Sequence, residues 1–286
     1  MTGNRTALTF STLIAAFLFA SSAIGEMVTE EKEVVLTDEE ALDIEIDFGL
    51  GELFIDACDP DKAFRLEGDY EDERFEYDYD YRKNKREGRL YFDISAESGN
   101  WHDRDVDNEW RLGLTDRIPI EFKVDIGAAS CEMRLGGLSV RRLWLDIGAA
   151  DCNISFEELN GCELDRIVVD AGASSVTLEE LGNARFGMLK FKGGVGSSDI
   201  DFSGKFDFDA EADISVGLGS VNIIVPEHIG VRIYAEDTFL SSIDIPKRHF
   251  EEIERDFYES RNWDDAEGHL EITLQVGMGS ANIDVR

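Results

Sequence analysis

Cysteine and aspartate side chains are the residues of this chain whose spacing could do chemistry. The four cysteines are Cys58, Cys131, Cys152 and Cys162, an even number that permits disulfides if the chain is exported. Cys131 and Cys152 each follow a Gly-Ala-Ala phrase with one residue between. If these phrases form neighbouring strands, their Cα atoms lie about 4.8 Å apart, within disulfide range. The alternative is two buried thiols that pack as small apolar side chains.

Aspartates recur at one position of the same phrase, as Asp125, Asp146 and Asp170. In stacked strands they would form a ladder on one face, which suggests a divalent cation as a partner. Two other acidic stretches fail as calcium loops. Counted from Asp103, an EF-hand loop would need Gly at its sixth position, where the chain has Asn108. The stretch from Gly193 to Asp201 has Ser198 where the calcium repeat of β-roll proteins has Asp.

No constellation of catalytic residues is present in the sequence. His102, His228, His249 and His269 share no motif, and the cysteines form no Cys-x-x-Cys zinc pair. Enzymes that cleave glycans on a β-helix need Asp, Arg and Lys clustered on one sheet, whereas residues 124–225 contain few Arg and Lys. We therefore predict no enzyme activity, no metal and no cofactor, and a glycan-binding or glycan-cleaving β-helix is a less favoured alternative.

A repeated phrase organises most of the chain. An alternating strand leads into a glycine followed by small residues, and a second alternating strand follows, as in Leu143–Phe156. From Gly127 to Gly217 the steps between copies are 21, 24, 22 and 23 residues, which is typical of a solenoid whose coils bury their apolar faces against each other. The predicted structural turns lie at Gly49, Gly127, Gly148, Gly172, Gly194, Gly217 and Gly277.

Each coil is predicted to contain a second turn and a set of inward side chains. The second turns are marked by Gly136-Gly137, Asn160-Gly161, Gly182-Asn183 and Ser203-Gly204. In the coil at Gly148 the predicted inward residues alternate along both strands, at Leu143, Leu145, Ile147, Cys152, Ile154 and Phe156. Large apolar residues at such positions each stabilise the fold by roughly 1.5–3 kcal/mol.

The two ends of the stack depart from the repeat. Residues 26–118 are predicted to form an N-terminal β region, or cap, with an antiparallel hairpin whose aromatic stripe is Phe75, Tyr77, Tyr79 and Tyr81. This stripe is read as the buried face of a sheet in preference to a carbohydrate platform. The solenoid occupies residues 119–286, with an insertion at about 235–268 in an atypical C-terminal cap. A short helix or an irregular loop is predicted for residues 248–261.

Residues 1–25 have the pattern of a secretory signal peptide, with Arg5 before an apolar run and small residues at Ala23 and Gly25. Without them the chain has 27 Lys plus Arg against 62 Asp plus Glu, a net charge of about −35. Nucleic acids would be repelled by this charge, so they are excluded as partners. We expect an acidic, secreted protein in the bacterial periplasm or at the cell surface, and no other segment has the roughly 20 apolar residues that span a membrane.

The phrases Asp-Ile-Gly-Ala-Ala and Val-Gly-Met-Gly-Ser-Ala-Asn-Ile resemble those of the bacterial toast-rack family, and the similarity covers about residues 40–286. This family includes the C-terminal domain of LiaF-like cell-wall-active antibiotics response proteins and related proposed adhesin domains. The resemblance implies a right-handed parallel β-solenoid in an envelope or surface protein, and it supplies no catalytic residues. LiaF-type members are membrane proteins that restrain a sensor kinase.

These observations predict an exported, non-enzymatic β-solenoid that acts as an adhesin-like or envelope-stress-related interaction protein. Its partner is expected to be an envelope or extracellular protein or polysaccharide, and the residues that bind it are not identified by the sequence. Two alternatives remain open, a divalent-cation-binding envelope protein and a LiaF-like regulator of a sensor kinase.

Overall fold

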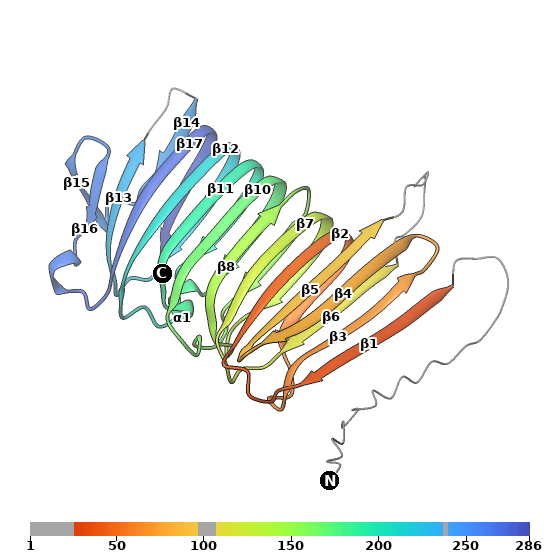
Figure 1. The fold of residues 1–286 in the computed structure, drawn as a ribbon. Helices are drawn as coiled ribbons and strands as arrows, with labels where there is room; N and C mark the ends of the chain where they lie inside the picture. The colour runs from red at the N-terminus through yellow and green to blue at the C-terminus, as the bar shows by residue number, and fades with distance from the viewer. Residues whose placement is uncertain (1–25, 97–106, 237–239) are drawn as a thin grey trace, which may run out of the picture.

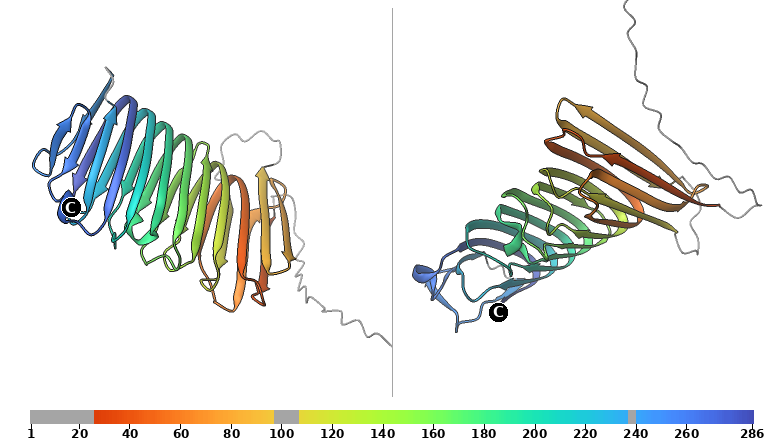
Figure 2. Two further views of the ribbon diagram at one scale, coloured as in Figure 1. Left: turned by 60° about the vertical axis from the view of Figure 1, so that its left-hand side comes forward. Right: turned by 90° about the horizontal axis from the view of Figure 1, so that it is seen from below.

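The computed structural model describes residues 26–96, 107–236 and 240–286, and in these ranges the chain is almost entirely β-strand. The predicted signal peptide and the acidic pair Asp103 and Asp105 lie outside these ranges. All-β architecture is confirmed. Six long strands bend over at a corner near their middle (Figures 1 and 2): β2 (Ala41–Ala57), β7 (Ile120–Arg134), β10 (Leu164–Glu179), β11 (Phe186–Asp201), β12 (Asp209–Val225) and β17 (His269–Val285).

These strands stack in parallel and in register. β2 pairs with β7, and β7 pairs with a coil split at its corner into β8 (Val140–Ile147) and β9 (Asp151–Ser155). β10, β11, β12 and β17 follow in that order. Equivalent residues of successive phrases are therefore direct neighbours, since Asp146 lies between Asp125 and Asp170.

The corner divides the sheet into two faces, which enclose the core between them. We call the part formed before the corner face 1 and the part formed after it face 2. Alternation along each strand sends every second side chain inward. The predicted inward residues Leu143, Leu145, Ile147, Cys152, Ile154 and Phe156 are all buried, with at most 4% of each residue exposed. Repetition of this pattern from coil to coil gives a continuous core.

The N-terminal end is closed by antiparallel strands. β5 (Glu87–Ala96) and β6 (Asn108–Leu114) lie beside β2 on faces 1 and 2 respectively. β4 (Phe75–Asn84) pairs with β5, while β3 (Lys62–Glu71) pairs with β6 and with β1 (Met27–Val35). The predicted aromatic hairpin is therefore confirmed as β4 and β5.

The aromatic stripe of this hairpin packs inward. Tyr77 lies 5.3 Å from the ring of Trp110, and Tyr81 lies 5.2 Å from the ring of Phe64. Trp110 itself is 1% exposed and stacks on Tyr70. Burial raises the pKa of Tyr77 to about 12. The stripe is a core element and presents no open aromatic platform.

The C-terminal end differs from the sequence prediction in its secondary structure. β13 (Gly230–Glu236) and β14 (Ser241–Asp244) pair with β17, so the last strand of the chain lies between β12 and β13. The helix or irregular loop predicted at 248–261 is wrong, because this segment forms a hairpin of β15 (Phe250–Glu254) and β16 (Phe257–Ser260). A short 3₁₀ turn, η1 (Trp263–Asp265), leads from the hairpin to β17.

The open edge of β13 explains why the hairpin forms. β16 pairs antiparallel with β13 and satisfies backbone groups that a helix would have left unpaired. Phe250 is 3% exposed, whereas Ile253 is 49% exposed, so the apolar spacing that suggested a helix does not correspond to one buried stripe.

Buried asparagines hold the second turns. Asn160 accepts a hydrogen bond from the backbone N–H of Val140 at 2.7 Å and donates to the carbonyl oxygens of Val140 and Cys162. In the next coil Asn183, in the single-turn helix α1 (Leu181–Ala184), donates to the carbonyl oxygen of Phe156. Such amides replace the turn hydrogen bonds that the backbone cannot make itself.

Neither α1 nor any other helix in the described ranges has the length and apolar character needed to cross a membrane.

Replacing Gly219 by Ala is expected to destabilise the stack by about 3 kcal/mol or more. Gly219 has φ 147°, and an added Cβ would overlap the carbonyl oxygen of Gly196 in the neighbouring strand. The denaturant midpoint of unfolding measures the effect. Ser220→Ala, one residue on and exposed, is the matched control and should change stability by less than about 0.5 kcal/mol. Equal midpoints for the two variants would contradict the close approach of Gly219 to the backbone of Gly196.

Candidate interaction surface

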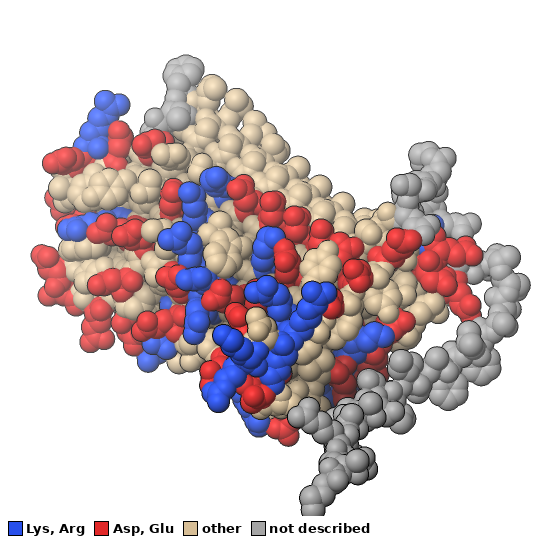
Figure 3. Space-filling view, viewed as in Figure 1, with Lys and Arg blue, Asp and Glu red and all other residues tan. Residues whose placement is uncertain are grey.

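An uncharged ridge runs along the corner of the stack. Its side chains occupy equivalent positions one residue after the corner glycine, from Leu50 and Ala128 to Ala173, Val195, Leu218 and Met278. Leu240, just before β14, lies at the end of the series, where its carbonyl oxygen accepts a hydrogen bond from Gly279. We call this series the corner row. Figure 3 shows it as an edge without charged side chains, above an acidic flank.

The apolar members of the corner row are exposed toward its C-terminal end. Val195 is 52% exposed, Leu218 44%, Met278 46% and Leu240 58%. Side chains of this size are usually buried, and covering each half-exposed one would contribute on the order of 1 kcal/mol. A continuous row of them is more typical of an interaction surface than of free solvent exposure.

A serine row runs beside the corner row on face 2. Its members occupy equivalent positions of successive strands, and their side chains point outward: Ser130, Ser175, Ser197, Ser220, Ser280 and Ser242. From Ser175 to Ser242 they are direct strand neighbours. Glu52 and Asp151 replace serine in two coils. Because neighbouring strands lie about 4.8 Å apart, the row presents hydroxyl groups at a regular spacing.

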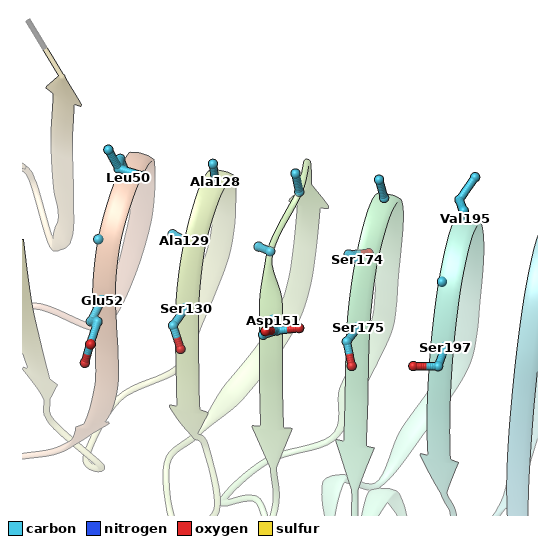
Figure 4. Close-up of a pocket in the computed structure, with 15 residues that line it drawn as sticks. Leu50, Glu52, Ala128, Ala129, Ser130, Asp151, Ser174, Ser175, Val195 and Ser197 are labelled. Carbon is cyan, nitrogen blue, oxygen red and sulfur yellow. The ribbon is translucent and has the colours of Figure 1, made fainter. Parts of the chain in front are cut away.

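Between the two rows lies a shallow groove of about 700 Å³, which Figure 4 shows from the side. Its floor consists of small residues such as Ala129, Ser174 and Gly196, so backbone is reachable there. Leu50, Ala128 and Val195 point away from the corner, while Ser130, Ser175 and Ser197 line the other side. The groove therefore offers apolar contact along one border and hydrogen-bonding groups along the other.

The predicted turn glycines form a column at the corner. A Cβ on Gly148, Gly172, Gly217 or Gly277 would lie 2.7–2.9 Å from the carbonyl oxygen of the corresponding glycine in the neighbouring coil. These glycines are thus required by the close approach of two backbones.

Left-handed backbone occurs two residues later, at Gly51, Gly196, Gly219 and Gly279. Sequence reasoning did not single out this second column. The Gly-x-Gly spacing in four of the copies is the signal that could have identified it.

Two protein-family models match this chain. The model of the N-terminal domain of toast-rack matches residues 23–179, and the model of the C-terminal part of LiaF, from the cell wall-active antibiotics response, matches residues 180–285. The chain belongs to the toast-rack family. The two matches meet between β10 and α1, within the continuous stack.

Solved structures similar to this toast-rack protein share little sequence with it. A proposed cell adhesion protein from Clostridium sporogenes is 19% identical, with a TM-score of 0.49 over 91% of this chain and 100% of its own. A proposed adhesin from Bacteroides fragilis is 9% identical, with a TM-score of 0.33 over 90% and 97% of the two chains. A proposed adhesin from Parabacteroides distasonis is 11% identical, with a TM-score of 0.34 over 92% and 98%. No curated protein matches the sequence.

The aspartate ladder has more members in the structure than the three predicted from the sequence. Asp125, Asp146 and Asp170 are in register on face 1, and the row continues through other strands of that face. The added members are Asp47, Asp93 and Asp78. Lys192 follows Asp170 in the next strand and forms an ion pair with it at 3.7 Å.

The ladder gathers negative charge without forming a closed ion site. Within the described ranges, no group of three or more His, Cys, Asp or Glu side chains is arranged to hold a metal ion. Burial raises the pKa of Asp93, and the neighbouring carboxylates of Asp47 and Asp78 raise it further. Cation binding by the row stays an untested alternative.

Cys131 and Cys152 lie opposite each other, as their phrases predicted. They are direct partners between β7 and β9, they are 2% and 4% exposed, and both are free thiols in the structure. Contact with Cys152 and burial both raise the pKa of the Cys131 thiol. Cys58 and Cys162 are half-buried free thiols elsewhere in the fold. A disulfide between Cys131 and Cys152 stays an untested alternative to two buried thiols.

Replacing Asp93 by Asn is expected to raise the melting temperature at pH 7. The folded-state pKa of Asp93 lies above its ordinary value, so the folded state binds the proton more tightly than the unfolded state. This residue's contribution to stability therefore becomes less favourable as pH rises through the carboxylate range. The gain should disappear near pH 3, where the wild-type carboxyl is protonated. A gain that persists at pH 3 would show that charge repulsion in the row is not the cause.

Alkylation distinguishes the thiol states of Cys131 and Cys152. At pH 8 the folded protein should leave both unmodified by iodoacetamide, because they are buried and because reaction requires the thiolate. Unfolding without reductant should then expose all four cysteines to the reagent, as the free thiols of the structure imply. Mass spectrometry of the peptides reads the result. Two cysteines that become reactive only after reduction would show that the bridge forms.

Proposed function

We propose that this protein is an exported, non-enzymatic right-handed β-solenoid that works as an adhesin-like interaction protein of the bacterial envelope or cell surface. The corner row and the serine row form its binding surface, and a protein is its partner there. The observation that carries the proposal is the line of exposed apolar side chains from Val195 to Leu240, beside a regular row of serines. Export is supported by the signal-peptide pattern of residues 1–25.

The charge distribution supports a partner at the corner. The chain has a net charge of −34, and close approach of another acidic macromolecule to its flanks would be opposed by repulsion. The corner row and most of the serine row carry no charge, so contact there avoids this penalty. Seven strand-to-strand steps of about 4.8 Å give the surface a length of roughly 34 Å, enough for an interface of ordinary size.

The stack itself supplies rigidity for binding. Val195 and Leu218 belong to strands paired on both sides, so their positions are fixed before a partner arrives, which lowers the entropic cost of association. A scaffold of this kind needs no catalytic group. It presents side chains at a spacing set by the backbone hydrogen bonds of the sheet.

A LiaF-like regulatory role is the second candidate. It is favoured by the match of residues 180–285 to the C-terminal part of LiaF. In that case the partner of the corner surface would be the extracytoplasmic part of a sensor kinase. Capture of proteins from an envelope fraction separates the two candidates by the identity of the retained protein.

The double variant Leu218→Glu/Met278→Glu should lose its partner, because two carboxylates would enter the apolar row. The purified protein is used to capture proteins from an envelope fraction, and quantitative mass spectrometry compares the variants. A partner retained by the wild type should fall by about tenfold or more. Leu159→Glu is the matched control, since Leu159 is 45% exposed outside the corner, and it should retain the partner. Equal capture by the double variant and the wild type would refute the assignment of this surface.

A further inference from the structure

A second groove, separate from the corner, lies on face 1 near the C-terminal end of the stack. It has a volume of about 530 Å³, within the usual size range of small-molecule sites. One row of side chains crosses its strands in the order Lys190, Asp213, Thr273 and Tyr234, from β11 to β13. Two short side chains lie between two long ones, and this difference in length hollows the surface. Three strand steps give the row a span of roughly 14 Å.

The ring of Tyr234 forms one wall of the groove and is held in place. Its other side stacks on Phe257 of the cap hairpin, with 4.5 Å between ring centroids and 17° between planes. Phe257 belongs to β16, whereas the groove lies over β17 and β12, on the opposite side of β13. Tyr234 is nevertheless 45% exposed. The ring therefore presents a flat apolar face to the groove at little conformational cost.

Four charged side chains of the groove have no salt-bridge partner in the described part of the chain. They are Arg166, Lys190, Glu211 and Asp213. By contrast, Glu271 at its border is paired with Arg232. Thr273 and Gln275 add a hydroxyl and an amide. Carboxylate, guanidinium, amide and hydroxyl groups together can donate and accept hydrogen bonds in many directions.

The balance of charge decides which class of ligand fits. Two cationic and three anionic side chains line the groove, in a chain of net charge −34. An anionic polymer would gain little from this site and would be repelled by the rest of the surface. A bound peptide strand is also disfavoured, because every strand under the groove is already paired on both sides. A ligand with hydroxyl groups and apolar C–H faces matches the groups present.

We propose that this groove binds an uncharged oligosaccharide, with one sugar ring packed on Tyr234 and its hydroxyl groups bound by Asp213, Thr273 and Lys190. The C–H face of a sugar ring covers the aromatic face, while the hydroxyls replace water on the free polar groups. The site lies on face 1, so it is distinct from the corner surface and takes a different class of ligand.

Binding is tested with the full protein and three uncharged probes, cellohexaose, maltohexaose and chitohexaose. Saturation-transfer difference NMR detects binding, and calorimetric titration measures the dissociation constant. At least one probe should bind, and Tyr234→Ala should weaken it by about tenfold or more, whereas Tyr234→Phe should stay within about threefold because the ring is kept. Trp144→Ala is the matched control, since Trp144 is an exposed aromatic residue of face 1 outside the groove, and it should bind as the wild type does.

Asp213→Ala provides an independent variant, because it changes an exposed side chain and leaves the Tyr234 and Phe257 stack intact. It should also weaken binding. The proposal is overturned if none of the probes binds at about 5 mM, if Tyr234→Ala binds as tightly as Tyr234→Phe, or if hexagalacturonate, an anionic probe, binds more tightly than all three. Loss of this proposal leaves the corner surface untouched, because the capture experiment with Leu218→Glu/Met278→Glu depends on different residues.

Discussion

Close contact between glycine backbones at the corner is the constraint on which the rest of the structure depends. From Gly127 to Gly277, a Cβ added to any corner glycine would lie 2.4–2.9 Å from the carbonyl oxygen of the corner glycine in the neighbouring strand. A side chain at any of these positions would force neighbouring strands apart and break their parallel hydrogen bonds. The contact therefore fixes the register of the stack, and a fixed register turns every repeated residue into a row. A second glycine column at Gly196, Gly219 and Gly279 tightens the bend by adopting a backbone conformation that other residues rarely take.

The rows that follow from this register give the two faces different chemistry. Face 1 has the aspartate row from Asp78 to Asp170, which ends where Lys192 takes the same position. In Figure 3, basic side chains gather over the middle of the molecule and acidic ones lie on both sides of them. The corner and serine rows carry almost no charge. A protein with a large net negative charge thus has a long border where another macromolecule can approach with little electrostatic penalty, and we assign the proposed interaction to this border.

The ends of the stack are closed by different means. At the N-terminal end, antiparallel strands and an aromatic cluster around Trp110 cover the last coil. At the other end the hairpin of β15 and β16 extends face 1 beyond β13. Both arrangements pair strand edges that would otherwise be open to other chains. The C-terminal arrangement also builds the second groove, since it places Phe257 behind Tyr234 and brings Thr273 beside it.

The sequence by itself determined the repeat, the glycine corners, the inward residues, the aromatic hairpin and the family. These features follow from short-range patterns, namely alternation of apolar and polar residues and recurring phrases, so they can be predicted without knowledge of distant contacts. Only the tertiary structure decided that β17 lies between β12 and β13, that residues 250–260 form a hairpin, and that Asp47, Asp93 and Asp78 extend the aspartate row. The same holds for the groove at Tyr234, whose walls come from segments far apart in the chain. The physical reason is that strand pairing depends on which strand edge is still unpaired and available, and local periodicity does not specify that edge.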